Sequence, residues 1–320
     1  MILCLADDPG GFDVVKPVYD ALCQDNNYHV KLLLVGASKK KETRFAYADN
    51  DVLIEIKKYI YSESLELLVT GTSWGRTIEL QAIVLCKEHN IKTISILDYW
   101  SNYSRRFFYL DKYIYPDYLF VPDKYALKGC VQDGIPREII QVTGHPGLDS
   151  FVKRKVRFST EKKALFLSQP LSALYGMKLG FNETTVFPKV MFVCKNLGYS
   201  VDVKFHPKET DKFKEQYRQF ECSEDLQDCL VRYRVLIGMN SMALLQYSLA
   251  GMPVISFEPD MVGCDLCITN KLGITIPTLD EEQLSERLRN IENFRMKEKY
   301  LWMDGMSTDR CVNEIRKVVQ

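Results

Sequence analysis

The sequence predicts an α/β protein with two doubly wound domains, each built on a parallel sheet that helices cover on both faces. Short, continuously apolar runs alternate with helical patterns from one end of the chain to the other. Such runs are typical of parallel strands that are buried on both faces. With 320 residues the chain is long enough for two domains of ordinary size. We expect the two domains to face each other across a central cleft.

The first half of the chain shows six apolar runs, and segments with helical periodicity separate most of them. We expect strands at 1–6, 30–35, 65–70, 92–97, 118–121 and 139–142. We expect helices at 12–22, 52–61, 76–88 and 124–133.

The pattern breaks between the two halves. Residues 153–163 are charged and weakly periodic, which is typical of an interdomain linker. We therefore expect a first domain over 1–147, a linker over 148–162 and a second domain over 163–320. The last helix could pack back on the first domain.

The alternation restarts in the second half, where helix boundaries are marked more clearly. Asn240 is expected to cap a helix that ends before Gly251, and Pro207 suits the first turn of another helix. Thr278 and Glu281 have the spacing of a capping box. We expect strands at 164–167, 200–205, 234–238 and 253–257, and helices at 183–196, 207–220, 241–250, 278–290 and 309–318.

Charge balance and cysteine spacing argue against several classes of protein. Lys and Arg number 42, as do Asp and Glu, so the chain lacks the basic excess typical of nucleic-acid binding. The N-terminus has no basic segment, and no apolar run approaches the roughly 18 residues that span a bilayer. We expect a soluble, cytoplasmic protein that could also contact the inner face of a membrane peripherally. Cys264 and Cys267 form a C-x-x-C pair with no second pair at short spacing, so we expect neither a metal nor another cofactor.

Two short motifs in the second half suggest a phosphate site. Lys204 and His206 follow one expected strand, and Asn240 and Ser241 follow another. Open α/β sheets bind ligands at the carboxyl ends of their strands. A cation-capable side chain beside a helix N-terminus can hold a phosphate without a metal. The alternative is that Asn240 and Ser241 only cap a helix and that backbone groups satisfy His206.

Four further residues are candidates for binding a nucleotide. Ser168 and Gln169 follow the first strand of the second domain, and Glu258 could accept hydrogen bonds from ribose hydroxyls. His145 lies where the first domain ends, so it either reaches into the cleft or belongs to a hinge. An ordinary turn at 168–169 and a solvated carboxylate at 258 are the alternatives.

The segment 7–11 joins the first strand to the first helix with the sequence Asp-Asp-Pro-Gly-Gly. Gly10 and Gly11 allow a tight turn and a ligand close to the backbone. The chain lacks both the G-x-G-x-x-G fingerprint and a P-loop. Asp8, or less favourably Asp7, could act as the general base that takes a proton from an acceptor hydroxyl. Helix capping is the alternative.

Two loops of the first domain are candidates for binding an acceptor. Thr72 and Ser73 follow the third strand, although hydroxyl residues also simply cap helices. The fourth strand leads into a loop rich in aromatic rings, which suit sugar faces, and in arginines, which suit phosphate. Its alternatives are a loop packed on its own rings and a membrane contact. Its candidate residues are Asp98, Tyr99, Trp100 and Arg105.

The D-x-D string 49–51 precedes a helical pattern, so we attribute it to helix capping and not to a metal.

These motifs resemble those of known families. Segment 142–149 resembles the junction of the two Rossmann-like domains in the glycosyltransferase B fold and in its relatives, the non-hydrolysing UDP-N-acetylglucosamine 2-epimerases. Segment 204–207 resembles the HP motif of bacterial sialyltransferases and polyol-phosphate transferases, and 238–241 resembles their serine motif, which contacts the donor phosphate. Segment 7–11 is more loosely similar to the loop that carries the catalytic base in those sialyltransferases.

One departure from the resemblance bears on the reaction. The epimerases carry a glycine pair and then an acidic pair after the serine, whereas Ser241 is followed here by Met242 and Ala243. This difference favours transfer over epimerisation. The resemblance thus implies a metal-independent glycosyltransferase that moves a sugar or a polyol phosphate from a nucleotide-activated donor to a glycan or glycolipid acceptor. The alternatives are a nucleotide-sugar 2-epimerase or hydrolase on the same scaffold, and a nucleotide-sugar-binding protein without catalysis.

Overall fold

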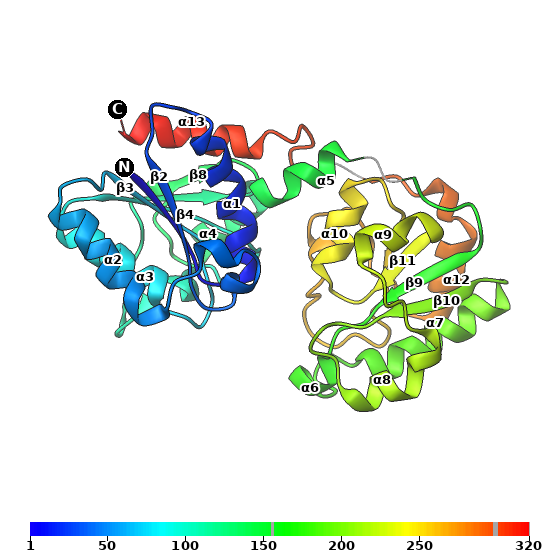
Figure 1. Ribbon diagram of the computed structural model, residues 1–320. Helices are drawn as coiled ribbons and strands as arrows, with labels where there is room; N and C mark the ends of the chain where they lie inside the picture. Colours follow the sequence, from blue (N-terminus) through cyan, green and yellow to red (C-terminus); the bar gives the residue numbers. More distant parts are fainter. Residues whose placement is uncertain (155–156, 297–299, 320) are drawn as a thin grey trace. The chain divides into compact units, whose positions relative to one another are not determined.

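The computed structural model describes residues 1–154, 157–296 and 300–319 (Figure 1). The chain divides into two compact units. Unit 1 comprises Met1–Ser150 and Tyr300–Gln320, and unit 2 comprises Phe151–Lys299. Within the expected linker 148–162, residues 149–153 form a short helix, and 155–156 lie outside the described residues.

Unit 1 is built on a six-stranded parallel sheet with the order β2-β1-β3-β4-β7-β8. In the centre of this sheet Cys4 pairs with both Leu32 and Val69. Every strand runs in the same direction, so all their carboxyl ends lie at one edge. The strands are β1 (Ile2–Ala6), β2 (Val30–Leu34), β3 (Leu67–Thr70), β4 (Lys92–Ile96), β7 (Tyr118–Val121) and β8 (Ile140–Val142).

Helices cover this sheet because its strands are apolar on both faces. Ile2, Cys4 and Ala6 point to one face, where they pack in a single cluster with residues of α1 and α13. The intervening residues point to the opposite face and are also buried. The helices of unit 1 are α1 (Pro9–Cys23), α2 (Asp49–Tyr61), α3 (Ile78–Glu88), α4 (Lys124–Gln132) and α13 (Ser307–Val319). In the sequence, α5 (Asp149–Lys153) spans the boundary between the two units. A small hairpin of β5 (Phe108–Tyr109) and β6 (Lys112–Tyr113) follows β4.

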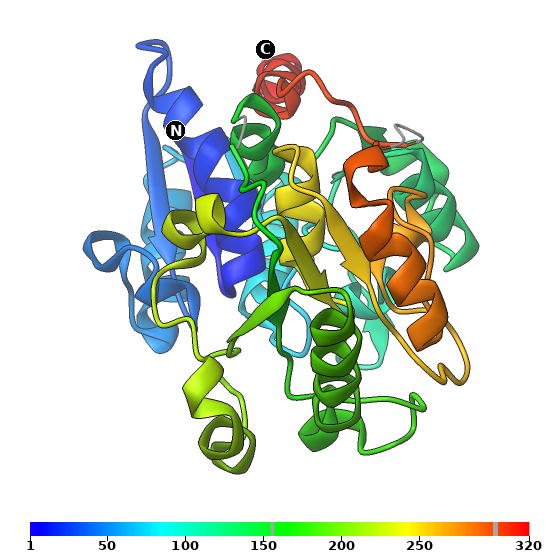
Figure 2. The same ribbon diagram turned by 90° about the vertical axis from the view of Figure 1, so that its right-hand side faces the viewer.

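Unit 2 contains a four-stranded parallel sheet with the order β10-β9-β11-β12. Its strands are β9 (Lys163–Leu167), β10 (Ser200–Lys204), β11 (Val235–Gly238) and β12 (Val254–Ser256). On one face, Phe166 packs against residues of α7 (Glu183–Asn196) and α12 (Glu281–Arg289), which lie side by side (Figures 1 and 2). The other helices are α6 (Leu171–Tyr175), α8 (Asp211–Tyr217), α9 (Leu226–Cys229), α10 (Met242–Leu249) and α11 (Ile268–Lys271). The α/β fold class with two parallel sheets is thereby confirmed.

In unit 2, three expected helix starts are wrong. Helix α8 begins at Asp211, capped by Thr210, because residues 206–209 form a turn in which Glu209 N–H bonds to His206 O. Ser241, not Asn240, caps α10. Asp280 caps α12, because the backbone of Thr278 pairs with Ser256 and Glu258 as an extension of the sheet.

Asp149 anchors the last helix to unit 1. Its two carboxylate oxygens accept hydrogen bonds from the N–H groups of Ser307 at 3.0 Å and Thr308 at 2.7 Å, which begin α13. The guanidinium of Arg310 donates from Nε to Thr143 O at 2.8 Å. These contacts join segments that lie about half the chain apart in sequence, and they explain why residues 300–320 belong to unit 1.

We predict that Asp149→Ala lowers the free energy of unfolding of unit 1 by about 1–2 kcal/mol, because two helix N–H groups lose their acceptors. Urea denaturation followed by circular dichroism measures this loss. Asp309→Ala is the matched control, since Asp309 is an exposed carboxylate in the first turn of the same helix. Equal effects of the two substitutions would contradict the anchoring role of Asp149.

Candidate functional site

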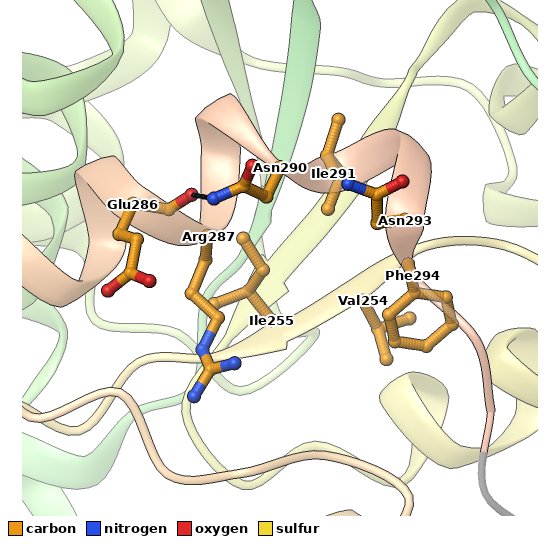
Figure 3. Close-up of a pocket in the computed structure, with 8 residues that line it drawn as sticks. All are labelled: Val254, Ile255, Glu286, Arg287, Asn290, Ile291, Asn293 and Phe294. Carbon is orange, nitrogen blue, oxygen red and sulfur yellow. Dashed lines mark hydrogen bonds between the residues drawn. The ribbon is translucent and has the colours of Figure 1, made fainter.

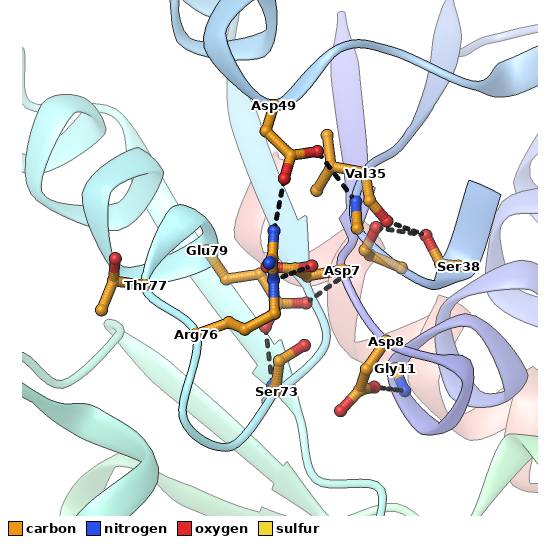
Figure 4. A network of polar contacts seen from close by, with 12 residues as sticks. Asp7, Asp8, Gly11, Val35, Ser38, Asp49, Ser73, Arg76, Thr77 and Glu79 are labelled. Atoms are coloured by element: carbon orange, nitrogen blue, oxygen red, sulfur yellow. Dashed lines mark hydrogen bonds and ion pairs between the residues drawn. The ribbon is translucent and has the colours of Figure 1, made fainter. Parts of the chain in front are cut away.

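The carboxyl edge of the unit 1 sheet gathers several acidic side chains, Asp7, Asp8, Asp49, Glu79 and Asp98, which we call the carboxylate cluster. Arg76 joins two of its members (Figure 4). Its Nε lies 2.6 Å from Asp7 Oδ1, and its Nη2 lies 2.5 Å from Asp49 Oδ2. Asp49 also accepts a hydrogen bond from Gly36 N–H at 3.0 Å. That bond and the cations of Arg76 and Lys39 lower the pKa of Asp49 to about 2.

Asp7 ends β1 and is fully buried. Burial raises the pKa of its carboxyl group, and the hydrogen bond and charge of Arg76 oppose this rise. Asp7 Oδ2 has no hydrogen-bond partner among the described residues. A buried carboxylate with one paired and one unpaired oxygen depends strongly on its single cation.

Glu79 lies beneath this edge and connects two strand ends (Figure 4). Its Oε1 accepts from Asp7 N–H at 3.3 Å, and its Oε2 accepts from Ser73 N–H at 2.7 Å. Burial is the main cause that raises the pKa of Glu79 to about 8, and the charges of Asp8 and Asp7 add to it. The Ser73 hydrogen bond acts in the opposite direction. Glu79 therefore holds the loops after β1 and β3 together as a largely protonated acid at neutral pH.

Asp8 and Asp98 are both half-buried members of the cluster. Asp8 Oδ1 accepts from Gly11 N–H at 2.6 Å and so caps α1, which was the alternative to a catalytic role. Burial and the charge of Asp98 raise the pKa of Asp8. A Cβ atom on Gly10 would lie 2.2 Å from Asp98 Oδ2, so only glycine permits this approach.

Asp98 is held by two donors on its other oxygen. Asp98 Oδ1 accepts from Arg106 Nη1 at 2.6 Å and from Thr72 Oγ1 at 2.9 Å. Arg106 is buried and lies next to Arg105, the arginine expected to bind an acceptor. Arg106, and not Arg105, is therefore the arginine that contacts Asp98.

The structure brings together most but not all of the residues expected in the first domain. Asp7, Asp8, Gly10, Gly11, Thr72, Ser73 and Asp98 lie at the same edge. Trp100 and His145 are instead buried and stack with ring centroids 5.5 Å apart. Trp100 Nε1 donates to Asp123 Oδ2, and His145 Nε2 contacts Asp98 O. Tyr99 packs edge-on against Trp100, which fits the alternative of a loop packed on its own rings.

Sequence reasoning missed Arg76, Glu79, Asp49 and Arg106. Asp49 was attributed to helix capping, yet Ala48 holds the cap position and the Asp49 carboxylate turns to Gly36 and Arg76. The only signal for Glu79 was its place directly between Ile78 and Leu80, which is weak because acidic residues are common in the first turn of a helix. The sequence held no comparable signal for the partners of Arg76 and Arg106.

At the corresponding edge of unit 2, β9 lies between the two strands that carry the expected phosphate motifs. Ser168 Oγ accepts from His206 N–H at 3.2 Å and donates to Glu209 Oε2 at 2.8 Å. Gln169 Oε1 accepts from Asn240 N–H at 3.0 Å. The loop after β9 thus connects the His206 turn to the Asn240 turn.

The side chains of the two motifs differ in how they are engaged. His206 Nδ1 accepts from Lys208 N–H at 3.1 Å, and burial together with the charges of Lys208 and Lys214 lowers its pKa. Lys204 Nζ bonds instead to the carbonyl oxygens of Cys222 and Glu224.

Ser241 and Asn240 stand at the start of α10. Ser241 Oγ accepts from Ala243 N–H at 3.2 Å, as a helix cap does. Asn240 Oδ1 is buried and has no hydrogen-bond partner among the described residues. The capping and anion-binding interpretations of Ser241 remain compatible, because both use the same end of the helix.

Glu258 follows β12 at the same edge and is fully buried. Its Oε2 accepts from Asn270 Nδ2 at 3.3 Å, and Asn270 also donates to Asp265 Oδ2 at 2.9 Å. Burial and the nearby charge of Asp265 raise the pKa of Glu258 to about 8. Glu258 is therefore not the solvated carboxylate of the alternative interpretation.

A pocket of about 210 Å³ lies on another side of unit 2, beside the outer strand β12 (Figure 3). Its lining comes from β12, from α12 and from the segment that follows α12: Val254, Ile255, Glu286, Arg287, Asn290, Ile291, Asn293 and Phe294. None of the residues expected to bind a ligand is among them, so we leave it outside the candidate site.

In the part of the chain that the structure describes, no helix is both long and apolar enough to cross a membrane.

Comparison with known proteins identifies relatives of the fold. No protein-family model matches this chain, and no curated protein matches it. A UDP-GlcNAc 2-epimerase from Methanocaldococcus jannaschii is similar in structure with a TM-score of 0.72 and 14% identity over 99% of both chains. A putative UDP-N-acetylglucosamine 2-epimerase from Listeria monocytogenes gives 0.69 and 11%, over 99% of this chain and 96% of that one. The UDP-GlcNAc 2-epimerase from Neisseria meningitidis, bound to UDP-GlcNAc, gives 0.67 and 12% over 99% of both.

These findings confirm the fold that the resemblance implied and correct the expected function. The similar structures are UDP-GlcNAc 2-epimerases, so the glycosyltransferase prediction is wrong and its epimerase alternative is better supported. The missing acidic pair after Ser241 was therefore given too much weight. The resemblance of the individual motifs stays a prediction.

We predict that Glu79 makes the stability of unit 1 depend on pH. The unfolded chain releases the Glu79 proton near its ordinary pKa of 4.5, whereas the folded chain retains it up to about 8. The free energy of unfolding of the wild type should therefore fall, relative to that of Glu79→Gln, by up to about 1.4 kcal/mol per pH unit within this window. Urea denaturation across the window measures the difference.

Glu88→Gln is the matched control for this measurement, since Glu88 is an exposed glutamate on the same helix. A wild-type curve that runs parallel to the Glu79→Gln curve across the window would show that Glu79 is ionised in the folded state.

Proposed function

We propose that this chain is a nucleotide-sugar 2-epimerase that acts on a UDP-linked sugar without an acceptor. The observation that carries the proposal is the likeness to UDP-GlcNAc 2-epimerases over 99% of this chain, together with acidic groups at the strand ends of unit 1. An enzyme that inverts a sugar carbon needs groups that remove a proton from one face and return one to the other.

The carboxylate cluster is suited to proton transfer. Asp98 lies against Gly10 and Asp8 against the next residue, Gly11, and the pKa of Asp8 is raised towards the working pH. A general acid or base is most effective when its pKa lies near that pH. Arg106 and Thr72 hold Asp98 in one orientation, and Glu79 fixes the loop that carries Asp7 and Asp8. In this proposal Asp8 and Asp98 transfer protons and the buried members position them.

Unit 2 is suited to holding the nucleotide. His206 can donate to a phosphate oxygen, and the N-terminus of α10 at Ser241 offers a favourable dipole for an anion. Asn240 contributes a buried amide with an unused oxygen. Glu258 is largely protonated near neutral pH, so it could both donate to and accept from a ribose hydroxyl. Stabilising the charge on the diphosphate is the part of the earlier interpretation that an epimerase shares with a transferase.

We predict that the chain exchanges the C2 proton of UDP-GlcNAc with solvent when no acceptor is present. Incubation in D₂O should remove the C2 proton signal from the NMR spectrum and should produce the C2 epimer. Asp8→Asn should slow exchange by about 10²–10⁴-fold, because the amide keeps the Gly11 contact but cannot accept the proton. Asp20→Asn, an exposed change on the same helix, should leave the rate unchanged.

Two other outcomes would each overturn the epimerase proposal. Release of UDP and free sugar without C2 exchange would identify a hydrolase. Tight UDP binding without any turnover would identify a non-catalytic nucleotide-sugar-binding protein.

We predict that His206→Ala raises the dissociation constant of UDP about 10- to 150-fold, because a charge-assisted hydrogen bond is worth about 1.5–3 kcal/mol. Affinity of the wild type should strengthen as the pH falls through the lowered pKa of His206, and the variant should lose this dependence. Thermal-shift titration with UDP measures both effects. Lys212→Ala, an exposed change on α8, is the control, and an unchanged affinity in His206→Ala would contradict the assigned role.

A further inference from the structure

Unit 1 has a pocket of about 440 Å³ next to the carboxylate cluster, within the roughly 300–1,000 Å³ typical of small-ligand sites. We call it the aromatic pocket. Three arginines and three aromatic residues contribute to its lining, and no carboxylate does. These six residues are Trp74, Arg76, Arg105, Arg106, Phe108 and Tyr113.

The arginines of the aromatic pocket differ in whether their charge is compensated. Arg76 is paired with two carboxylates, and Arg106 is paired with Asp98. The Arg105 side chain is exposed, and its guanidinium forms no hydrogen bond or ion pair with any described residue. The pocket therefore has one free guanidinium on a wall that carries no negative charge. A free guanidinium of this kind suits an anion, which it can bind through two parallel N–H groups.

The aromatic rings of this pocket are unusually exposed. Trp74 is 57% exposed, Phe108 48% and Tyr113 52%. Phe108 and Tyr113, on the two strands of the β5–β6 hairpin, pack edge to face with ring centroids 5.3 Å apart. A concave surface lined by large, exposed apolar rings is more often a binding site than an ordinary part of the protein surface. Their flat faces suit a ligand that has a flat apolar face of its own.

The hairpin holds its two rings in place through an unfavourable turn. Leu110 and Asp111 both have positive φ angles, 47° and 60°. Residues other than glycine, asparagine and aspartate rarely adopt this conformation, and Leu110 is exposed at the tip. Such local strain persists where the surroundings fix it, and it often accompanies binding surfaces. The turn presents Phe108 and Tyr113 on the side of Trp74.

We propose that the aromatic pocket binds an anionic saccharide, namely a hexose that carries a phosphate or a carboxylate. Arg105 binds the anion, and the rings of Trp74, Phe108 and Tyr113 pack against the C–H face of the sugar. A pocket with an uncompensated cation selects against neutral sugars, and aromatic walls select against small inorganic anions. This site is distinct from the nucleotide site proposed in unit 2 and does not depend on the epimerase reaction.

Tryptophan fluorescence of the full chain tests the proposal, because the chain has only three tryptophans. In a Trp302→Phe background the remaining rings are Trp74, in the pocket, and Trp100, which is buried. Titration at constant ionic strength uses glucose 6-phosphate, glucuronate, glucose, inorganic phosphate and UMP. We expect saturable changes with glucose 6-phosphate and with glucuronate, and binding of glucose and of phosphate at least about tenfold weaker. Comparing the two anionic sugars shows whether the site prefers a phosphate or a carboxylate.

Variants place the signal in the pocket. Arg105→Ala should weaken glucose 6-phosphate binding about tenfold, and Arg105→Lys should weaken it less. Arg289→Ala is the matched control, since Arg289 is an exposed arginine of unit 2 with no partner among the described residues. His206→Ala should leave the titration unchanged, which separates this site from the nucleotide site.

Trp74→Phe removes the fluorescent ring from the pocket but keeps an aromatic wall. Isothermal titration calorimetry with this variant checks that glucose 6-phosphate still binds. Three results would overturn the proposal: no saturable binding of either anionic sugar, tighter binding of UMP than of glucose 6-phosphate, or equal losses in Arg105→Ala and Arg289→Ala.

Discussion

The contact of Arg76 with Asp7 and Asp49 is the interaction on which the edge of unit 1 depends. Asp7 is buried directly after β1, and the charges of Asp8 and Asp7 raise the pKa of Glu79. Without a cation, several carboxylates in so small a space would repel one another and would bind protons. Arg76 compensates two of them, and Glu79 reduces the total charge by keeping its proton. The cluster therefore exists because charge pairing and protonation act together.

Backbone contacts are as important to this edge as charge. Glu79 accepts N–H groups from the loops after β1 and β3, which are neighbouring strands. A Cβ atom on Gly71 would lie 2.7 Å from Gly11 Cα, so the two loops touch without side chains between them. A rigid edge of this kind can hold Asp8 and Asp98 in a fixed orientation. The unit 2 edge uses another device, since the loop after β9 hydrogen-bonds to the turns on both sides of it.

The corrected function shows what a phosphate motif does and does not determine. A transferase and an epimerase that use nucleotide sugars must both stabilise the charge of a diphosphate. In the proposed function the groups at 206 and 241 would serve that task equally well in either enzyme, so they cannot distinguish the two reactions. The distinguishing groups are those that act on the sugar, and in this chain the proposed candidates for them lie in unit 1, where Asp98 accepts from Arg106 of its own loop and from Thr72 of the loop after β3. The aromatic pocket is a further surface of unit 1, and the proposed binding of the nucleotide does not require it.

The sequence by itself determined the fold class, because continuous apolar runs such as 2–6 and 235–238 allow only buried parallel strands between helices. It also indicated the strand ends at Asp7, Asp98, Ser168 and Asn240, since strand ends follow from local periodicity. The tertiary structure alone decided the partners: Arg76 reaches Asp7 across 69 positions, and Ser307 reaches Asp149 across 158. It also decided that Ser241 and Asp280 cap their helices and that Lys204 turns to backbone carbonyls. Contacts between distant segments and the burial that shifts the pKa of Glu79 and Glu258 arise only when the sheets assemble, because no local pattern of residues encodes them.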